Sequence, residues 1–245
     1  MKVIDVSRHN GIINWEKVKA DGVDGVIIRA GYGRLSSQKD SRFEENYAGA
    51  KAVGLNVGTY FYTYAKSTDE AETEAEVFLE WIKGKTFELP VYFDIEDQSI
   101  NHLSRDVLTD ICLRWCGRVE KAGYYTGIYA NVYWFSRLLD TDRLSAYDKW
   151  LAHWAEKPAY DESFGGMWQY SSTGRINGIN GDVDLNKMYR DYPSVIKRAE
   201  LNGFKKVSGY SVYAKANVTF ETAAHELAEK CRLLGMSAEV KKLAE

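Results

Sequence analysis

Two carboxylates, Asp94 and Glu96, stand two residues apart in the segment Leu-Pro-Val-Tyr-Phe-Asp-Ile-Glu-Asp at 89–97. The apolar, β-branched run after Pro90 is typical of a buried strand. Residues two apart on a strand share a face, with Cβ atoms roughly 6–7 Å apart. Their charges repel, so at least one pKa should be raised. An enzyme that needs one protonated and one ionised carboxyl group uses such a pair; solvated acids at an exposed strand end are the alternative.

Other acidic residues stand at the ends of short apolar segments. Asp5 follows the apolar start of Lys-Val-Ile-Asp-Val-Ser at 2–7, and Asp182, Asp184 and Asn186 alternate along 181–186. Each cluster alone is a weak signal. Together they predict carboxylates that converge from the ends of separate strands.

Strand and helix patterns alternate along residues 1–190. The helices between the early strands begin at capping residues, such as Ser67 with Glu70, and end at glycines. This alternation predicts parallel strands with crossover helices, and no long helix fits after 149–155. The sequence therefore predicts an α/β fold, a modified, flattened β/α (TIM-like) barrel with about eight strands and fewer helices, in which the chemistry lies at the carboxyl ends of the strands. The predicted strands are 2–6, 24–30, 56–64, 90–96, 125–130, 149–155, 166–171 and 182–185.

Caps are predicted for the four early helices at Asn14, Ser41, Ser67 and Ser104. Aromatic and amide side chains fall on the same strand ends as the acids. Rings stack on the apolar faces of pyranoses, and amides bond hydroxyl and acetamido groups, so this combination suits a sugar-binding cleft.

The alternation of side chains along each strand selects the residues of this cleft. Trp168 and Gln169 occupy opposite faces, and we expect Gln169 to point inward. For Tyr60 and Trp150 we favour the alternative that the ring simply fills the barrel. The predicted cleft residues are Tyr62, Tyr129, Asn131, Trp154 and Gln169.

The composition excludes several classes of protein. The net charge of −3 gives no footprint of nucleic-acid binding, and no apolar run of about 18 residues predicts a membrane span. The four histidines do not form a ligand set by their spacing, so we expect no metal and no cofactor. Cys112, Cys116 and Cys231 lack a metal-ligand neighbourhood, and the helical spacing of Cys112 and Cys116 favours buried free thiols.

Eight motifs occur in an order that resembles glycoside hydrolase family 25, the muramidases of bacteria, fungi and many phage endolysins. The resemblance covers residues 1 to about 192. It implies a modified β/α barrel that cleaves the β-1,4 bond between N-acetylmuramic acid and N-acetylglucosamine in peptidoglycan. The motifs are Asp-Val-Ser (5–7), Val-Ile-Ile-Arg-Ala-Gly-Tyr-Gly (26–33), Gly-Thr-Tyr-Phe-Tyr (58–62), Pro-Val-Tyr-Phe-Asp-Ile-Glu (90–96), Gly-Ile-Tyr-Ala-Asn (127–131), Lys-Trp-Leu-Ala-His-Trp (149–154), Met-Trp-Gln-Tyr (167–170) and Val-Asp-Leu-Asn (183–186).

The resemblance also implies roles for the acids. Glu96 becomes the general acid, Asp94 its partner carboxylate, and Asp5 and Asp184 the flanking acids. Many relatives have Thr-Glu-Gly after the second strand where this chain has Gly-Tyr-Gly, so we expect Tyr32 to serve there in substrate binding. The spacing of the carboxylates does not separate retention from inversion. A catalytically silent glycan-binding module on the same fold is the alternative function.

The tail lies outside the resemblance. We expect a catalytic domain at 1–195, a linker at 196–206 and a small βαβ module at 207–245 that binds cell wall or self-associates into a homo-oligomer. So small a unit cannot cover its own apolar helix face. The first strand begins directly after Met1-Lys2, so we expect no signal peptide, synthesis in the cytoplasm and action on the bacterial wall after release, as in a phage endolysin.

Overall fold

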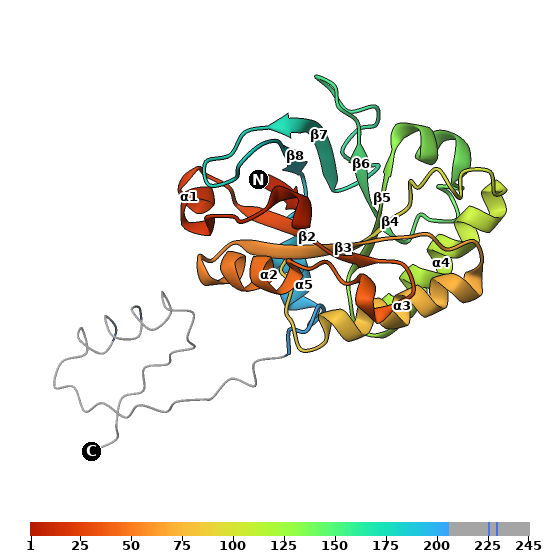
Figure 1. Cartoon of the computed structure of the whole chain (residues 1–245), viewed down its shortest axis with the longest axis horizontal. Coiled ribbons are helices and arrows are strands. Elements are labelled where there is room, and N and C mark those ends of the chain that lie inside the picture. Colours follow the sequence, from red (N-terminus) through yellow and green to blue (C-terminus); the bar gives the residue numbers. More distant parts are fainter. Residues whose placement is uncertain (206–224, 226–228, 230–245) are drawn as a thin grey trace, which may run out of the picture. The chain divides into compact units, whose positions relative to one another are not determined.

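The N-terminal part of the chain folds around a closed barrel. The computed structural model describes residues 1–205 together with His225 and Glu229. Within this part, eight strands follow one another round the barrel in sequence order (Figure 1). The predicted TIM-like barrel is therefore confirmed. The strands are β1 (Lys2–Val6), β2 (Gly25–Tyr32), β3 (Asn56–Tyr62), β4 (Val91–Asp94), β5 (Thr126–Asn131), β6 (Asp148–Ala152), β7 (Met167–Gly174) and β8 (Val183–Met188).

The last strand departs from the parallel arrangement that the sequence predicts. Strands β1 to β7 pair in parallel, whereas β8 runs antiparallel to both β7 and β1. A parallel connection needs a crossover of a dozen or more residues, and the link from Gly174 to Val183 is too short for one. Strand β8 therefore returns in the opposite direction and closes the barrel against β1.

Helices cover the barrel on the side of the early strands. Asn14, Ser67 and Ser104 cap their helices as predicted, each accepting a hydrogen bond from the backbone three residues on. The cap predicted at Ser41 is wrong, because the Asp40 carboxylate accepts the backbone N–H at the start of that helix instead. The described helices are α1 (Trp15–Ala20), α2 (Phe43–Ala52), α3 (Thr68–Ile82), α4 (Arg105–Lys121) and α5 (Tyr192–Arg198), with short helical turns at Arg8–Asn10, Ser36–Gln38 and Trp134–Leu138.

Two apolar layers surround and fill the barrel. Helices α3 and α4 lie side by side along its outside (Figure 1), and there Trp115 packs between Phe61 and Phe93. Inside the barrel Trp150 is fully buried and Tyr60 meets it edge-on, as the filling interpretation predicts. Side chains thus pack the barrel interior. The other inner residues include Val3, Ile27, Leu89, Tyr92, Met167 and Met188.

A segment after α5 packs against the amino ends of β4 and β5. The buried Asn202 side chain donates hydrogen bonds to the carbonyls of Phe87 (3.1 Å) and Leu89 (2.9 Å) and accepts one from the N–H of Tyr125 (2.7 Å). One amide therefore satisfies three buried backbone groups. This part of the predicted linker at 196–206 belongs to the folded barrel.

Several predictions for the tail concern residues outside the described ones. They are the module at 207–245 and its self-association. In the described part of the chain, Cys112 and Cys116 of α4 are buried and free, as predicted. No helix there combines the length and apolar character that crossing a membrane would require.

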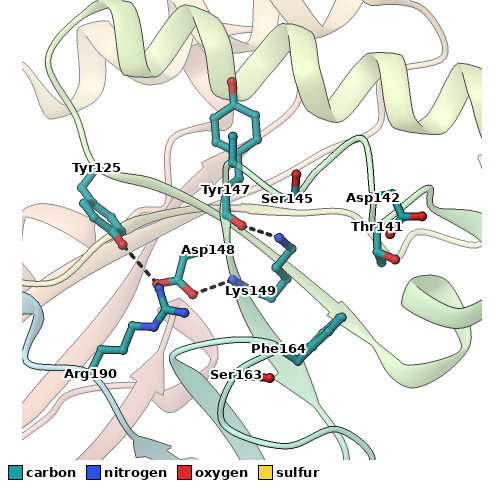
Figure 2. Close-up of a pocket in the computed structure, with 11 residues that line it drawn as sticks. Tyr125, Thr141, Asp142, Ser145, Tyr147, Asp148, Lys149, Ser163, Phe164 and Arg190 are labelled. Carbon is teal, nitrogen blue, oxygen red and sulfur yellow. Dashed lines mark hydrogen bonds and ion pairs between the residues drawn. The ribbon is translucent and has the colours of Figure 1, made fainter.

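A pocket of about 290 Å³ is lined by residues at the amino ends of β5 and β6 (Figure 2). Asp94 and Glu96 lie at the other end of the strands, at and just after the carboxyl end of β4. The centre of the pocket is the buried Asp148 carboxylate, which accepts hydrogen bonds from the backbone N–H groups of Lys149 (2.8 Å) and Gly166 (2.9 Å). The hydroxyls of Tyr192 (2.6 Å) and Tyr125 (3.3 Å) donate to its other oxygen. Arg190 adds an ion pair to the same oxygen at 3.4 Å (Figure 2). Five donors therefore make Asp148 a structural carboxylate.

Replacing Asp148 by Ala should destabilise the protein by about 3–5 kcal/mol, because it leaves five buried or partly buried donors without their acceptor. Urea unfolding followed by circular dichroism measures this loss. The matched control is Asp142→Ala in the wall of the same pocket, where the carboxylate is exposed and a change within about 0.5 kcal/mol is expected. Equal effects of the two substitutions would contradict the structural role.

Candidate active site

The strand register brings the predicted site residues to one end of the barrel. Asp5 of β1 lies opposite Asp184 of β8. Asp94 of β4 lies between Tyr62 of β3 and Tyr129 of β5. These positions are the carboxyl ends of the parallel strands, where barrel enzymes carry their chemistry. On the opposite side of the rim, paired neighbours follow in the order Asn131, Ala152, Gln169 and Asn186.

Asp5 and Asp184 form a carboxyl pair. Asp5 accepts hydrogen bonds from the side-chain amides of Asn186 (2.8 Å) and Gln169 (3.0 Å). Burial raises the pKa of Asp5 to about 6, although these amides and Asp184 favour its ionised form. Burial, followed by the charge of Asp5, raises the pKa of Asp184 to about 8. At neutral pH Asp184 therefore keeps a proton that it donates to the ionised Asp5.

The charge of Glu96 also acts on Asp94. Asp94 is buried, and burial followed by the charge of Glu96 raises its pKa well above the usual range. One of its oxygens, Oδ1, has no hydrogen-bond partner among the described residues. Glu96 is half-buried and accepts a hydrogen bond from the Asn131 amide (3.2 Å). Burial raises the pKa of Glu96 too, which confirms the expectation of at least one raised pKa.

Gln169 links the acids to the aromatic residues. Its Oε1 accepts hydrogen bonds from the Tyr129 hydroxyl (3.0 Å) and the Trp154 indole N–H (3.0 Å), while its amide group donates to Asp5. The expectation that Gln169 rather than Trp168 points inward is thus confirmed. Tyr129 is itself nearly buried, with its hydroxyl engaged by Gln169, whereas Trp154 is 63% exposed.

Tyr32, Tyr62 and Tyr64 form an aromatic surface, here called the tyrosine surface, at the ends of β2 and β3. The Tyr62 hydroxyl donates a hydrogen bond to Asp97 (2.9 Å), the residue after Glu96. The rings of Tyr62 and Tyr64 lie 5.3 Å apart, and Tyr32 meets Tyr64 edge-on at 6.0 Å. This surface and Trp154 of the β6–β7 loop lie on either side of the strands β4 and β5 that carry Asp94 and Asn131.

Arg29 is a site residue that the sequence reasoning missed. Its Nε and Nη2 both contact the buried Asp40 carboxylate (2.8 and 2.7 Å). Its positive charge lowers the pKa of Asp94 and so favours the ionised form of that carboxylate. The signal was available in the strand pattern, since Arg29 shares the inward face of β2 with Ile27.

The paired acids predict that stability falls as pH rises. The folded-state pKa values of Asp5 and Asp184, about 6 and about 8, lie above their ordinary value of 3.8. Between these values the folded state holds protons that the unfolded chain has released, so their stabilisation is complete below about pH 4 and is lost as pH rises through about 8. Thermal melting at about pH 5 and about pH 8 measures the effect. Asp184→Asn should flatten the profile, and an unchanged slope in that variant would contradict the shared proton.

Comparison with known proteins agrees with this arrangement. Residues 4–179 match the family model described as glycosyl hydrolases family 25, which is more than half of the chain. The chain belongs to glycosyl hydrolases family 25. This result confirms the family that the eight motifs indicate.

Relatives of this family 25 chain include lysozymes. The autolytic lysozyme of Clostridium acetobutylicum is 31% identical over 191 residues, a match that covers 76% of this chain and 55% of the relative. The chain therefore spans about half the length of that protein.

Two solved structures share the family 25 barrel. A bacterial lysozyme from Streptomyces coelicolor has a TM-score of 0.71 and 28% identity, with 84% of this chain and 98% of that chain covered. The modular autolysin LytC from Streptococcus pneumoniae, in complex with a synthetic peptidoglycan ligand, has a TM-score of 0.67 and 29% identity, with 76% of this chain and 46% of that chain covered.

Proposed function

We propose that the chain is an N-acetylmuramidase, a lysozyme that cleaves the β-1,4 bond between N-acetylmuramic acid and N-acetylglucosamine in peptidoglycan. The observation that carries this proposal is the group of four carboxylates at one end of the barrel, flanked by the tyrosine surface and by Trp154. The four carboxylates are Asp5, Asp94, Glu96 and Asp184. A protein that only bound glycan would gain nothing from buried acids that repel one another. The glycosidases of the family and the peptidoglycan ligand of LytC support the substrate class.

In this reaction Glu96 is the general acid. It is the longer and more exposed of the two acids on β4 and its loop, and the Asn131 amide orients its carboxyl group. Burial raises the pKa of Glu96, which is the direction that a general acid for the glycosidic oxygen requires. Asp94 is its partner carboxylate, which in its ionised form stabilises positive charge at the anomeric carbon. The positive charge of Arg29 favours that ionised form, against the burial and the charge of Glu96 that raise the pKa of Asp94.

The remaining groups hold this pair and the sugar. Asp5 and Asp184 share one proton, and Asp5 fixes the Gln169 amide. Gln169 in turn holds the indole of Trp154 through a hydrogen bond. Trp154, Tyr62 and Tyr32 then supply rings for stacking on pyranose faces, and Asn131 supplies an amide at the rim.

A zymogram on purified cell walls, with a wall-sedimentation assay in parallel, tests the proposal. The full chain should clear the gel and release soluble glycan fragments. Sedimentation with the walls without any release of fragments would instead support a silent glycan-binding module. Neither binding nor release, from walls of several bacteria with different peptide cross-links, would contradict the substrate class as well.

A further inference from the structure

A buried acid outside the carboxylate cluster has no role in the proposed reaction. Glu74 stands on the core-facing side of α3, where its neighbours on that face are Ala71, Ala75 and Phe78, and it is fully buried. Helix positions of this kind normally carry apolar residues. An ionisable group there is costly unless it is hydrogen-bonded.

Both hydrogen bonds to Glu74 come from the segment that follows β3. The Thr63 hydroxyl donates to one carboxyl oxygen (2.5 Å), and the backbone N–H of Tyr64 donates to the other (3.1 Å). The N–H of Ala65 donates to the Thr63 hydroxyl in turn (3.0 Å). One side chain on α3 therefore fixes three successive residues at the end of the strand.

This segment carries part of the aromatic surface of the site. Thr63 is buried against α3, so the alternation of side chains turns its neighbours Tyr62 and Tyr64 the other way, towards the barrel mouth. Their rings pack against each other, and Tyr62 also reaches Asp97 beside Glu96. The Tyr64 side chain remains 42% exposed, available for stacking.

We propose that Glu74 is a positioning residue that holds Tyr62 and Tyr64 as one stacking surface for the glycan, with Tyr64 as a sugar contact. The inference rests on the proposed muramidase function for the identity of its ligand. Glu74 touches none of the four carboxylates of the site. The ladder bond from the N–H of Thr63 to the carbonyl of Asp94 (3.0 Å) contains no atom of Glu74, so it survives substitution.

Steady-state kinetics of full-length variants on soluble, uncrosslinked peptidoglycan strands test the inference. Glu74→Leu should raise KM roughly two- to tenfold, the equivalent of one aromatic contact, with kcat within about twofold. Glu74→Gln should keep the wild-type KM, because the glutamine oxygen can still accept from the backbone N–H of Tyr64 and its amino group can donate to the Thr63 hydroxyl. Glu80→Leu makes the same change at an exposed position of α3 and should leave KM unchanged.

If Glu74→Leu fails to fold, Thr63→Val serves as the second variant. It removes the hydroxyl that bonds Glu74 and should also raise KM. Calorimetric binding of an alternating N-acetylglucosamine–N-acetylmuramic acid tetrasaccharide separates this inference from the proposed function. A wild-type protein that neither binds nor cleaves the glycan defeats the function itself. An active wild type whose folded Glu74→Leu and Thr63→Val variants keep its KM and glycan affinity overturns the positioning role, as does a Glu74→Gln variant as defective as Glu74→Leu.

Discussion

Glu96→Gln should reduce the rate of cell-wall hydrolysis by at least about a hundredfold, the smallest usual share of general acid catalysis. Glutamine keeps the size of the side chain. It can still accept a hydrogen bond from the Asn131 amide, which in the wild type donates to Glu96 Oε2 at 3.2 Å. It has no acidic proton to give to the glycosidic oxygen. The measurement is the initial rate of release of reducing ends from purified peptidoglycan.

The control for this substitution is Glu156→Gln, which makes the same chemical change at an exposed position of the β6–β7 loop. It should retain the wild-type rate. Melting temperatures of both variants show that the fold is intact. Near-normal hydrolysis by a folded Glu96→Gln protein would remove Glu96 from the role of acid.

Asp94→Asn should reduce the rate of cell-wall hydrolysis about as much as Glu96→Gln does. It should nevertheless leave the protein at least as stable as the wild type. Activity falls by about a hundredfold or more because a charge that stabilises the transition state is removed. Stability does not fall, because Asp94 is a buried acid with one unpartnered oxygen that faces the charges of Glu96 and Asp5. Activity assays and urea unfolding of the same preparation measure the two effects.

The contrast with Asp148 makes this prediction specific. Both carboxylates are buried in the barrel wall, but Asp148 satisfies five donors and stands at the amino ends of the strands. Loss of Asp148 should cost stability, and loss of Asp94 should cost activity. A marked loss of stability in Asp94→Asn would show that Asp94 is a structural acid instead.

Local patterns were sufficient to predict most of the barrel. Period-two alternation located the strands to within a few residues, and it put Gln169 and Trp168 on opposite faces, of which Gln169 points inward as expected. The direction of β8 was missed, because alternation is the same in parallel and antiparallel strands. Only the short link before Val183 carried that information.

The structural roles of Asn202 and Asp148 were not predicted from the sequence, because their hydrogen-bond partners lie far away along the chain. Asn202 bonds Phe87, and Asp148 bonds Tyr192, across separations that no local pattern reveals. Arg29 had a local signal, an inward-facing cation on a buried strand, but its anchor Asp40 lies in a loop without a motif. Such pairings are decided by how the barrel closes, which the sequence does not display.

The most direct test of the proposed function is the chemical identity of the new reducing ends. Peptidoglycan digested by the full chain would be reduced with borohydride, hydrolysed and analysed by mass spectrometry. A muramidase leaves N-acetylmuramic acid at each new reducing end, so the account predicts N-acetylmuramitol, absent after treatment with Glu96→Gln. Recovery of N-acetylglucosaminitol instead, or of the same muramitol from the Glu96→Gln digest, would contradict it.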